Sequence, residues 1–298
     1  MTALLATSGL GKRYRGAWAL RDCTLQIPEQ SIVGIAGSNG AGKSTLLGLA
    51  VGLLDPSEGS VAVSGRDPRR DAAALADIGY VAQGAPLYRG FTVGDMLDFA
   101  RVTNARWDHA LAQQLLSRSS PKTRVSALSP GERAQLALAL ALGKRPALLL
   151  LDEPLARLDP LASRDFLRLL MEGAAETGSA VVVATRVLGD IERICERVVL
   201  LGHGQVRLDG TVEDLLASHR LLTGVRRPLG RIRGVERIVR ERSSGRQLTL
   251  LVRTDAPVVD PTWSVEQMGL EELLLAYMAP EELPSPQPPE PSRLRWHG

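Results

Sequence analysis

Short apolar runs alternate with amphipathic segments over the first two thirds of the chain. The apolar runs contain five or six residues each, as do strands that are buried on both faces of a parallel sheet. They are Ser31–Ala36, Ala147–Leu151, Ala180–Ala184 and Arg197–Leu201. The segments between them predict helices over residues 43–52, 131–143 and 160–177, the second ending at Gly143 as its C-cap. This order predicts an α/β fold whose parallel sheet is covered on both faces.

Two other regions have a different pattern of apolar and polar residues: the N-terminal segment, and residues 86–126 between the first two of these strands. Near the N-terminus, Ala3–Thr7 and Ala19–Ile27 are two predicted strands before a break at Pro28. Residues 86–126 have a mostly helical pattern with turns near Gly90 and Asn104, which predicts a helical lobe.

The last quarter of the chain is rich in arginine. Nine arginines lie between Arg220 and Arg246, against two glutamates. Val235–Arg240 and Gln247–Val252 are predicted strands around a Ser-Ser-Gly turn, and Leu270–Met278 is a predicted helix. The segment from Pro280 is rich in proline, which predicts disorder. We therefore expect a main domain over residues 1–220 (helical lobe about 86–143), a small α+β appendage over 221–279 and a tail over 280–298.

Composition narrows the class of protein. The chain has 298 residues, 44% of them hydrophobic, which is enough for one large domain and a small appendage. Its net charge of +3 is too small to indicate nucleic-acid binding by itself. Its two cysteines, Cys23 and Cys195, exclude a disulfide scaffold and are expected in the core. No apolar run approaches the roughly 18 residues of a membrane span, and no signal peptide is recognised.

A phosphate-binding loop follows the first buried strand. It comprises Gly37, Ser38, Asn39, Gly40, Ala41, Gly42, Lys43, Ser44 and Thr45, and fits the pattern G-x-x-x-x-G-K-[ST]. Glycines let the backbone N–H groups turn toward an anion, and the start of the following helix adds partial positive charge. Lys43 is expected to reach the β/γ-phosphates of ATP, and Ser44 to place its hydroxyl on Mg²⁺.

Two carboxylates end another buried strand. Asp152 and Glu153 follow four leucines, at the strand end where α/β sheets bind ligands. Such a pair alone is usually a solvated turn. Beside a phosphate loop, we expect Asp152 to hold Mg²⁺ through water and Glu153 to polarise the attacking water.

These motifs, in this order, resemble those of ABC ATPases over roughly residues 3–217. The resemblance implies a P-loop NTPase with a parallel-sheet core, an N-terminal antiparallel β subdomain and a helical signature subdomain. It places Tyr14 on the adenine and makes Gln83 the link between Mg²⁺ and a membrane subunit. Asp159, in residues 156–159, matches a loop that signals across a dimer.

Leu128-Ser129-Pro130-Gly131-Glu132 resembles the family's signature, with Pro130 and Glu132 in place of glycine and glutamine. Ser129 is a good N-cap, Pro130 suits the first helical position, and Glu132 completes a capping box. The segment therefore still predicts a helix start that can face a phosphate, to which Ser129 and Gly131 would contribute. In this family the signature of one subunit completes the ATP site of the other.

Arg186 departs from the family, which carries a histidine at this place. It stays charged and only donates hydrogen bonds, so it could clamp the γ-phosphate or pair with Glu153 and slow hydrolysis. His203, in a later turn, does not replace it and is expected to be an ordinary surface residue.

The resemblance implies an ATP-hydrolysing subunit that forms a homo- or heterodimer and drives a separate permease from the cytoplasmic face of the membrane. Gly269–Leu274 resembles the end of ATPases that serve ABC-2-type permeases, which favours export. An ATP-gated dimerisation switch with little hydrolysis is the alternative, because of Arg186.

The single cassette and the near-neutral charge disfavour action on nucleic acid. The arginine-rich segment indicates either a solvated basic face or contact with acidic lipid headgroups or a partner.

Overall fold

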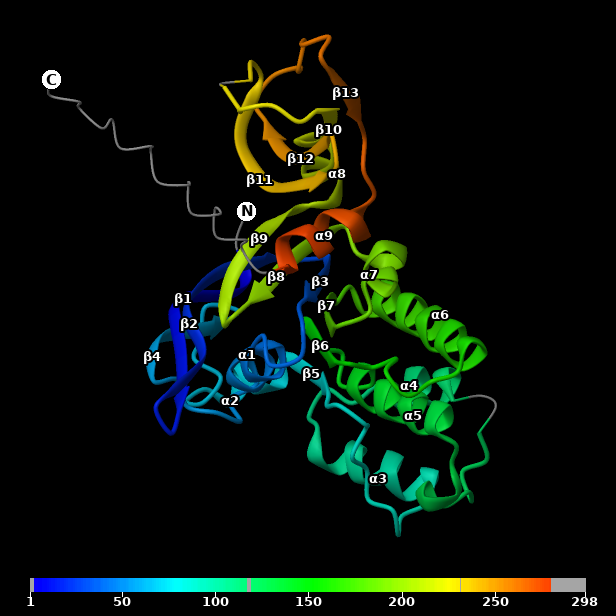
Figure 1. Cartoon of the computed structure of the whole chain (residues 1–298). Helices are drawn as coiled ribbons and strands as arrows, with labels where there is room; N and C mark the ends of the chain where they lie inside the picture. Colours follow the sequence, from blue (N-terminus) through cyan, green and yellow to red (C-terminus); the bar gives the residue numbers. More distant parts are fainter. Residues whose placement is uncertain (1–2, 117–118, 231, 280–298) are drawn as a thin grey trace, which may run out of the picture.

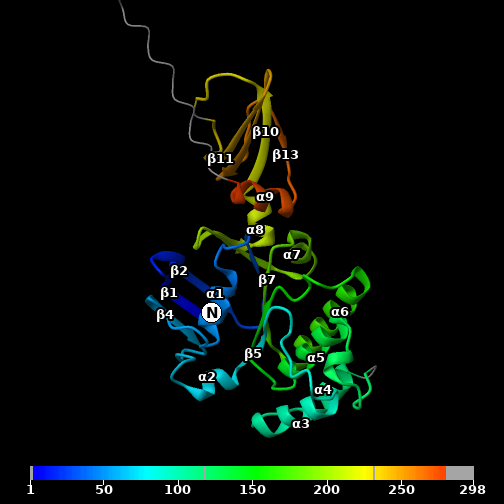
Figure 2. The same cartoon turned by 60° about the horizontal axis from the view of Figure 1, so that its bottom comes forward.

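The computed structural model describes residues 3–116, 119–230 and 232–279, which form three β-sheets with helices around them (Figure 1). The proline-rich segment 280–298 lies outside the described residues. The largest sheet is at the centre, with an N-terminal sheet beside it, helices on its other side and a C-terminal sheet at one end (Figures 1 and 2).

The central sheet has six strands in the order β5-β6-β7-β3-β8-β9. The first five are mutually parallel, and β9 pairs antiparallel with β8. Their bounds are β3 Ile32–Ala36, β5 Ile78–Val81, β6 Leu148–Asp152, β7 Ala180–Thr185, β8 Arg197–Gly202 and β9 Gln205–Thr211. The four apolar runs of the sequence are thus strands of one sheet, as predicted.

Alternate residues of β6 belong to different cores. Leu148 and Leu150 pack with α1 (Lys43–Ala50) and the N-terminal sheet, whereas Leu149 and Leu151 pack with α5 (Pro130–Leu142) and α6 (Pro160–Thr177). Side chains of a strand point alternately to the two faces, so a strand covered on both must be apolar throughout. Both faces of the sheet are therefore covered, and both cysteines are buried, as expected.

The N-terminal sheet is antiparallel, in the order β2-β1-β4. It consists of β1 Ala3–Tyr14, β2 Ala17–Pro28 and β4 Glu58–Val63, and the helix α2 (Ala72–Ala76) follows. The first two strands are longer than their apolar patterns predict, because they extend into an exposed hairpin around Arg15 and Gly16.

The helical lobe contains α3 (Val93–Thr103), α4 (His109–Leu115), a 3₁₀ turn at Val125–Ala127 and the start of α5. Its interior joins the core on the α5 and α6 side of the central sheet through Met96, Leu97 and Leu111. Ser129 and Pro130 begin α5 as the capping pattern predicts, and Gly143 ends it.

The C-terminal sheet is antiparallel, in the order β11-β12-β10-β13, and begins at His219. Its strands are β10 His219–Val225, β11 Val235–Ser244, β12 Gln247–Thr254 and β13 Trp263–Glu266. Three short helices join it to the central sheet: α7 (Leu188–Ile194), α8 (Val212–Ala217) and α9 (Leu270–Met278). Leu270, Leu273 and Leu274 of α9 share one core with Leu188 and Ile191 of α7.

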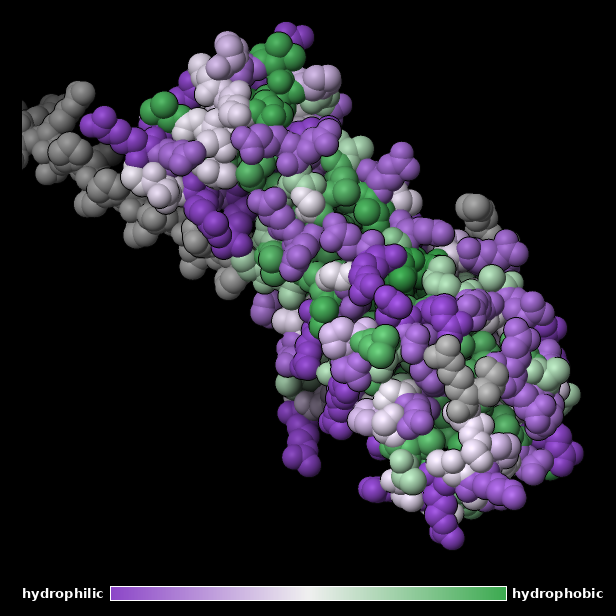
Figure 3. All heavy atoms as spheres, turned by 90° about the vertical axis from the view of Figure 1, so that its right-hand side faces the viewer, coloured by the Kyte–Doolittle hydropathy of each residue, from purple (hydrophilic) through white to green (hydrophobic). Residues whose placement is uncertain are grey.

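No helix among the described residues is long and apolar enough to cross a bilayer. On the face shown in Figure 3, hydrophilic side chains predominate, with smaller hydrophobic areas between them.

Candidate nucleotide-binding and hydrolysis site

The phosphate loop connects β3 to α1, and its shape depends on Gly42. This residue has φ 105°, and a Cβ atom there would lie 2.5 Å from the carbonyl oxygen of Ala19. The loop therefore packs directly on the backbone of β2, which leaves no space for a side chain at Gly42.

Lys43 is buried and turned back onto the loop. Its Nζ donates hydrogen bonds to the carbonyl oxygens of Gly37 (2.8 Å) and Ser38 (3.1 Å). It also lies 3.5 Å from Oε1 of Glu153. Among the described residues, two carbonyls and one carboxylate hold this ammonium group, and a phosphate would offer it further charge-assisted bonds.

Ser44 and Asp152 form the candidate metal site. The hydroxyl of Ser44 donates to Oδ1 of Asp152 over 3.0 Å, although 108 residues separate them in the sequence. Burial raises the pKa of Asp152, and the hydrogen bond from Ser44 opposes this shift. A bound cation would offset the cost of keeping this carboxylate charged. Mg²⁺ prefers oxygen ligands and commonly takes one or two from the protein and others from phosphates, so these two residues fit it.

Glu153 begins the segment after β6 with φ 47°, a strained conformation for a residue with a side chain. Its N–H donates to the carbonyl of Ala184 over 2.8 Å, which fixes it between the ends of β6 and β7. The residue is only 8% exposed, and Oε2 is buried without a hydrogen-bond partner among the described residues. The fold thus keeps a carboxylate with an unused acceptor next to Lys43.

Gln83 lies beside Glu153, whereas Tyr14 is related to the phosphate loop only through the hairpin to which it belongs. Gln83 follows β5, which pairs with β6, and lines the same small cavity as Glu153. Tyr14 is 44% exposed at the end of β1, in the hairpin whose other strand contacts Gly42. Lys12 Nζ lies 5.2 Å from the centre of its ring.

Ser129 and Asp159 both cap helices. Ser129 accepts a hydrogen bond from the N–H of Glu132 (3.2 Å), and Glu132 accepts one from the N–H of Ser129 (2.8 Å). This is the predicted capping box, and hydrogen bonding of the Glu132 carboxyl by the backbone N–H and the side chain of Ser129 lowers the pKa of Glu132. Asp159 accepts from the N–H groups of Leu161 and Ala162 at the start of α6, a role that its placement in the family motif did not indicate.

Arg186 is exposed directly after β7, two residues before α7. Within the described residues, neither an ion pair nor a hydrogen bond joins its guanidinium to Glu153. The nearest cation in an ion pair with Glu153 is Lys43 instead. His203 is exposed in the turn between β8 and β9, as expected.

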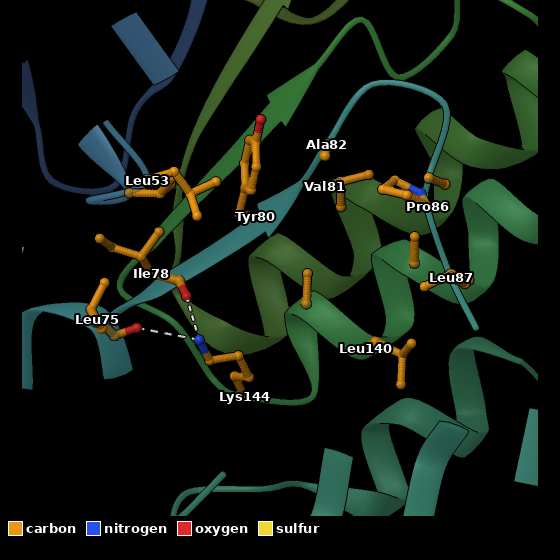
Figure 4. A pocket seen from close by; sticks show the side chains of 14 residues that line it. Leu53, Leu75, Ile78, Tyr80, Val81, Ala82, Pro86, Leu87, Leu140 and Lys144 are labelled. Carbon is orange, nitrogen blue, oxygen red and sulfur yellow. Dashed lines mark hydrogen bonds between the residues drawn. The ribbon is translucent and has the colours of Figure 1, made fainter. Parts of the chain in front are cut away.

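Sequence reasoning missed a groove on the side of the sheet where β5 meets α5 (Figure 4). Its volume is about 410 Å³, and it is lined mainly by apolar side chains, among them Leu53, Leu75, Leu87 and Leu140. Lys144 lies at its edge and donates to the carbonyl oxygens of Leu75 (3.2 Å) and Ile78 (2.6 Å). Only the apolar residues around 75–87 hinted at it, and these come together with α5 through the fold.

An exposed aromatic cluster follows the groove-lining segment 85–87. Tyr88, Phe91 and Phe99 have ring centroids 5.3 to 6.4 Å apart, and Tyr88 is 60% exposed. Two of the chain's three phenylalanines are thus at the surface, and exposed apolar patches of this kind are typical of interaction sites.

A parallel sheet that carries a phosphate loop after one strand and an acidic pair after another defines a P-loop nucleotide hydrolase. Residues 20–156 match the family described as "ABC transporter". An uncharacterized ABC transporter ATP-binding protein of Bacillus subtilis is 32% identical over 216 residues, which cover 70% of each chain. A phosphonates import ATP-binding protein of a Synechococcus species is 34% identical, over 72% of this chain and 88% of that protein. A lipopolysaccharide export ATP-binding protein of Acidithiobacillus ferridurans is 30% identical, over 72% and 93%.

Solved structures agree with these relatives. An ATP-binding subunit of an ABC transporter superposes with a TM-score of 0.64 at 27% identity, over 72% of this chain and 92% of that one. A dimeric bacterial ABC transporter cassette gives 0.62 at 26% identity, over 70% and 98%. The chain belongs to the ABC transporter ATP-binding proteins and is an ATPase of that family.

Proposed function

We propose that this chain is the ATP-driven subunit of an export-type ABC transporter. Two such subunits would close on ATP and drive a separate permease at the cytoplasmic face of the membrane. The main observation in support of a partner that drives or is driven by this chain is the groove of Figure 4. The two elements that form the groove, β5 and α5, each have one end at the proposed nucleotide site.

One wall of the groove is β5, which ends two residues before Gln83. The other wall is α5, whose N-terminus is the signature segment Ser129–Gly131. A partner helix seated in the groove would therefore displace both Gln83 and the signature when it moves. The cluster of Tyr88, Phe91 and Phe99 extends this apolar surface, and helices commonly dock in such grooves by their apolar faces.

In the proposed reaction, the loop N–H groups and Lys43 bind the phosphates, and Glu153 accepts a proton from the attacking water. Mg²⁺, held by Ser44 and Asp152, would neutralise developing phosphate charge. Gln83 lies next to Glu153 and would link Mg²⁺ to the permease, and Tyr14 would stack its exposed ring on the adenine.

Dimer formation is supported by the dimeric cassette among the similar structures. The start of α5 would then contribute Ser129 and Gly131 to the partner's ATP, with Asp159 near the dimer contact. Whether the two subunits are identical does not affect this chemistry.

The proposed direction of transport is supported by a single feature of the sequence. The relatives named above include both an importer and an exporter, so they do not decide it. Export is favoured by the resemblance of Gly269–Leu274 to the ends of ATPases that serve ABC-2-type permeases.

The alternative of a poorly hydrolysing switch rests on Arg186. The ion pair of Glu153 with Lys43 and the exposed position of Arg186 favour an active enzyme. Phosphate release should be measured on the purified chain, on Arg186→His and on membranes that contain the permease. Turnover that stays negligible in all three would support the switch.

Docking can be tested by disulfide cross-linking of single cysteines at Leu140 or Phe99 to cysteines in cytoplasmic loops of the permease. We expect cross-links from both positions and none from Leu275→Cys, which lies on the distant α9. Cross-links only from Leu275→Cys would contradict the proposed docking surface.

The basic strand β11 lies at the end of the molecule opposite to α3 and its aromatic cluster (Figures 1 and 2). If the permease docks in the groove, this placement favours a solvated basic face over contact with lipid headgroups. Liposome flotation with Arg240→Glu and Arg242→Glu tests this, and weaker binding of either variant would instead support the lipid contact.

A further inference from the structure

A small cavity lies beside Glu153, and none of the described residues of the phosphate loop lines it. Its volume is about 100 Å³. Three segments line it: Val81–Ala85 from the end of β5, the first turns of α5 and residues from the segment 153–158 after β6. A cavity needs about 10–15 Å³ of such volume to hold a water, so this one has space for water.

Two opposite charges in its lining have buried atoms without partners. Oε2 of Glu153 and Nε of Arg133 are both buried, and neither has a hydrogen-bond partner among the described residues. Buried donors and acceptors are rarely left without partners, because each then loses its hydrogen bonds to water without replacement. A donor on a cation and an acceptor on a carboxylate that line one cavity of this size can be joined through water.

The two oxygens of Glu153 thus have separate surroundings. Oε1 lies 3.5 Å from Lys43, which belongs to the phosphate loop. When phosphates bind, they compete for Lys43, and Glu153 then depends more on its other oxygen. Any group that orients Oε2 at that stage determines where the carboxylate points.

We propose that Arg133 is a positioning residue that orients Glu153 through water in this cavity. This inference rests on the proposed role of Glu153 as the base. Arg133 stands one turn into α5, where its N–H donates to the carbonyl of Ser129 over 3.0 Å. Arg133 therefore moves with the signature segment, so that α5 would act on the partner's ATP through its first residues and on its own Glu153 through Arg133.

The test is steady-state ATP hydrolysis by the full-length chain with Arg133→Gln and Arg133→Lys. We expect Arg133→Gln to lower kcat by about 10- to 100-fold while KM and the affinity for ATP stay unchanged. Arg133→Lys restores a cation in the cavity and should recover part of the loss. A protein that merely lost packing would show no such recovery, and thermal unfolding of both variants identifies a misfolded one.

Arg168→Gln is the control, since Arg168 lies on α6 outside the lining of the cavity and forms a surface ion pair with Glu172. We expect a much smaller effect than for Arg133→Gln. Equal losses in both variants, or an unchanged kcat in Arg133→Gln, would overturn the proposal. Glu153→Gln is measured in parallel: if it keeps its rate, the role of Glu153 itself fails, whereas loss in Glu153→Gln with normal Arg133→Gln rejects only the positioning role.

Discussion

At the scale of single residues, Gly42 limits what the phosphate loop can tolerate. A side chain there would have to adopt a positive φ of 105°. It would also need space that the carbonyl oxygen of Ala19 already occupies, since that oxygen lies 2.5 Å from where a Cβ atom would stand.

We therefore predict that Gly42→Ala abolishes measurable ATP binding and lowers the unfolding temperature. Gly40→Ala is the control, because Gly40 also has positive φ (79°) but, within the described part of the chain, no atom within 4 Å of a Cβ. It should cost only the backbone strain of about 1 kcal/mol. Calorimetric titration with ATP and thermal unfolding check both variants, and equal behaviour would show that crowding at Gly42 is unimportant.

His219, the first residue of β10, connects the C-terminal sheet to helices α8 and α9 through two hydrogen bonds of its buried side chain. Its Nδ1 lies 2.7 Å from the carbonyl of Leu215 and its Nε2 2.9 Å from the hydroxyl of Tyr277. The carbonyl can only accept, so Nδ1 carries the proton and Nε2 accepts from Tyr277. Burial lowers the pKa of His219, as do Arg253 and Arg237 more weakly, whereas the Leu215 carbonyl and Glu236 oppose this shift.

This shift predicts a loss of stability in acid. Above about pH 6.5 the imidazole is neutral in both folded and unfolded chains, and below it the unfolded chain binds the proton more readily. Unfolding temperatures between about pH 8 and about pH 5.5 should therefore fall less in His219→Gln than in the natural chain. His203→Gln, at an exposed position, is the control for the substitution itself.

At the scale of elements, two helices begin with the same capping box. Ser129 with Glu132 begins α5, and Thr92 with Asp95 begins α3. Only the first belongs to the segment that resembles the family signature.

Ser129→Ala and Thr92→Ala should each destabilise the chain by about 1 kcal/mol, because each removes one cap. We expect only Ser129→Ala to lower ATP hydrolysis markedly, through its contact with the partner's nucleotide. Denaturant unfolding and phosphate release separate the two effects. Equal hydrolysis by both variants would mean that Ser129 is a cap and nothing more.

The elements also show how far sequence patterns reach. The strands β3, β6, β7 and β8 and the helices at 160–177 and 270–278 were predictable, because continuous apolar runs and helical periodicity reflect burial directly. The buried strand β5 was missed, because its four residues include Gly79 and form no longer apolar run. Short, partly exposed elements such as β4, β9 and α2 carry no such pattern and were missed. The phosphate loop and the acidic pair were predictable from their motifs, but the Ser44–Asp152 bond and the Lys43–Glu153 pair depend on strand order.

Strand β11 shows a further limit. Arg237, Arg240 and Arg242 lie opposite residues 253, 251 and 249 of β12, which share one face because they alternate. Simple alternation along β11 would place Arg237 and Arg240 on opposite faces. A bulge between Ile238 and Arg240 places both arginines on the same face, and no feature of the sequence predicts this bulge.

At the scale of the whole molecule, the C-terminal sheet and the ATPase core share apolar side chains. The core that contains Leu273 of α9 also contains Ile191 of α7 and Ala36, which precedes the phosphate loop. Helix α7 begins two residues after Arg186. A change in the C-terminal sheet can therefore reach the segment that carries Arg186 through packing alone.

We predict that Leu273→Ala lowers the stability of the whole chain by about 2–5 kcal/mol, because Leu273 is fully buried. Leu275→Ala on the same helix should have little effect, since Leu275 is 52% exposed. If the two parts act as one unit, Leu273→Ala will shift a single thermal transition and also alter ATP turnover. A separate early transition with unchanged ATP turnover would instead show that the C-terminal sheet unfolds independently and does not influence Arg186.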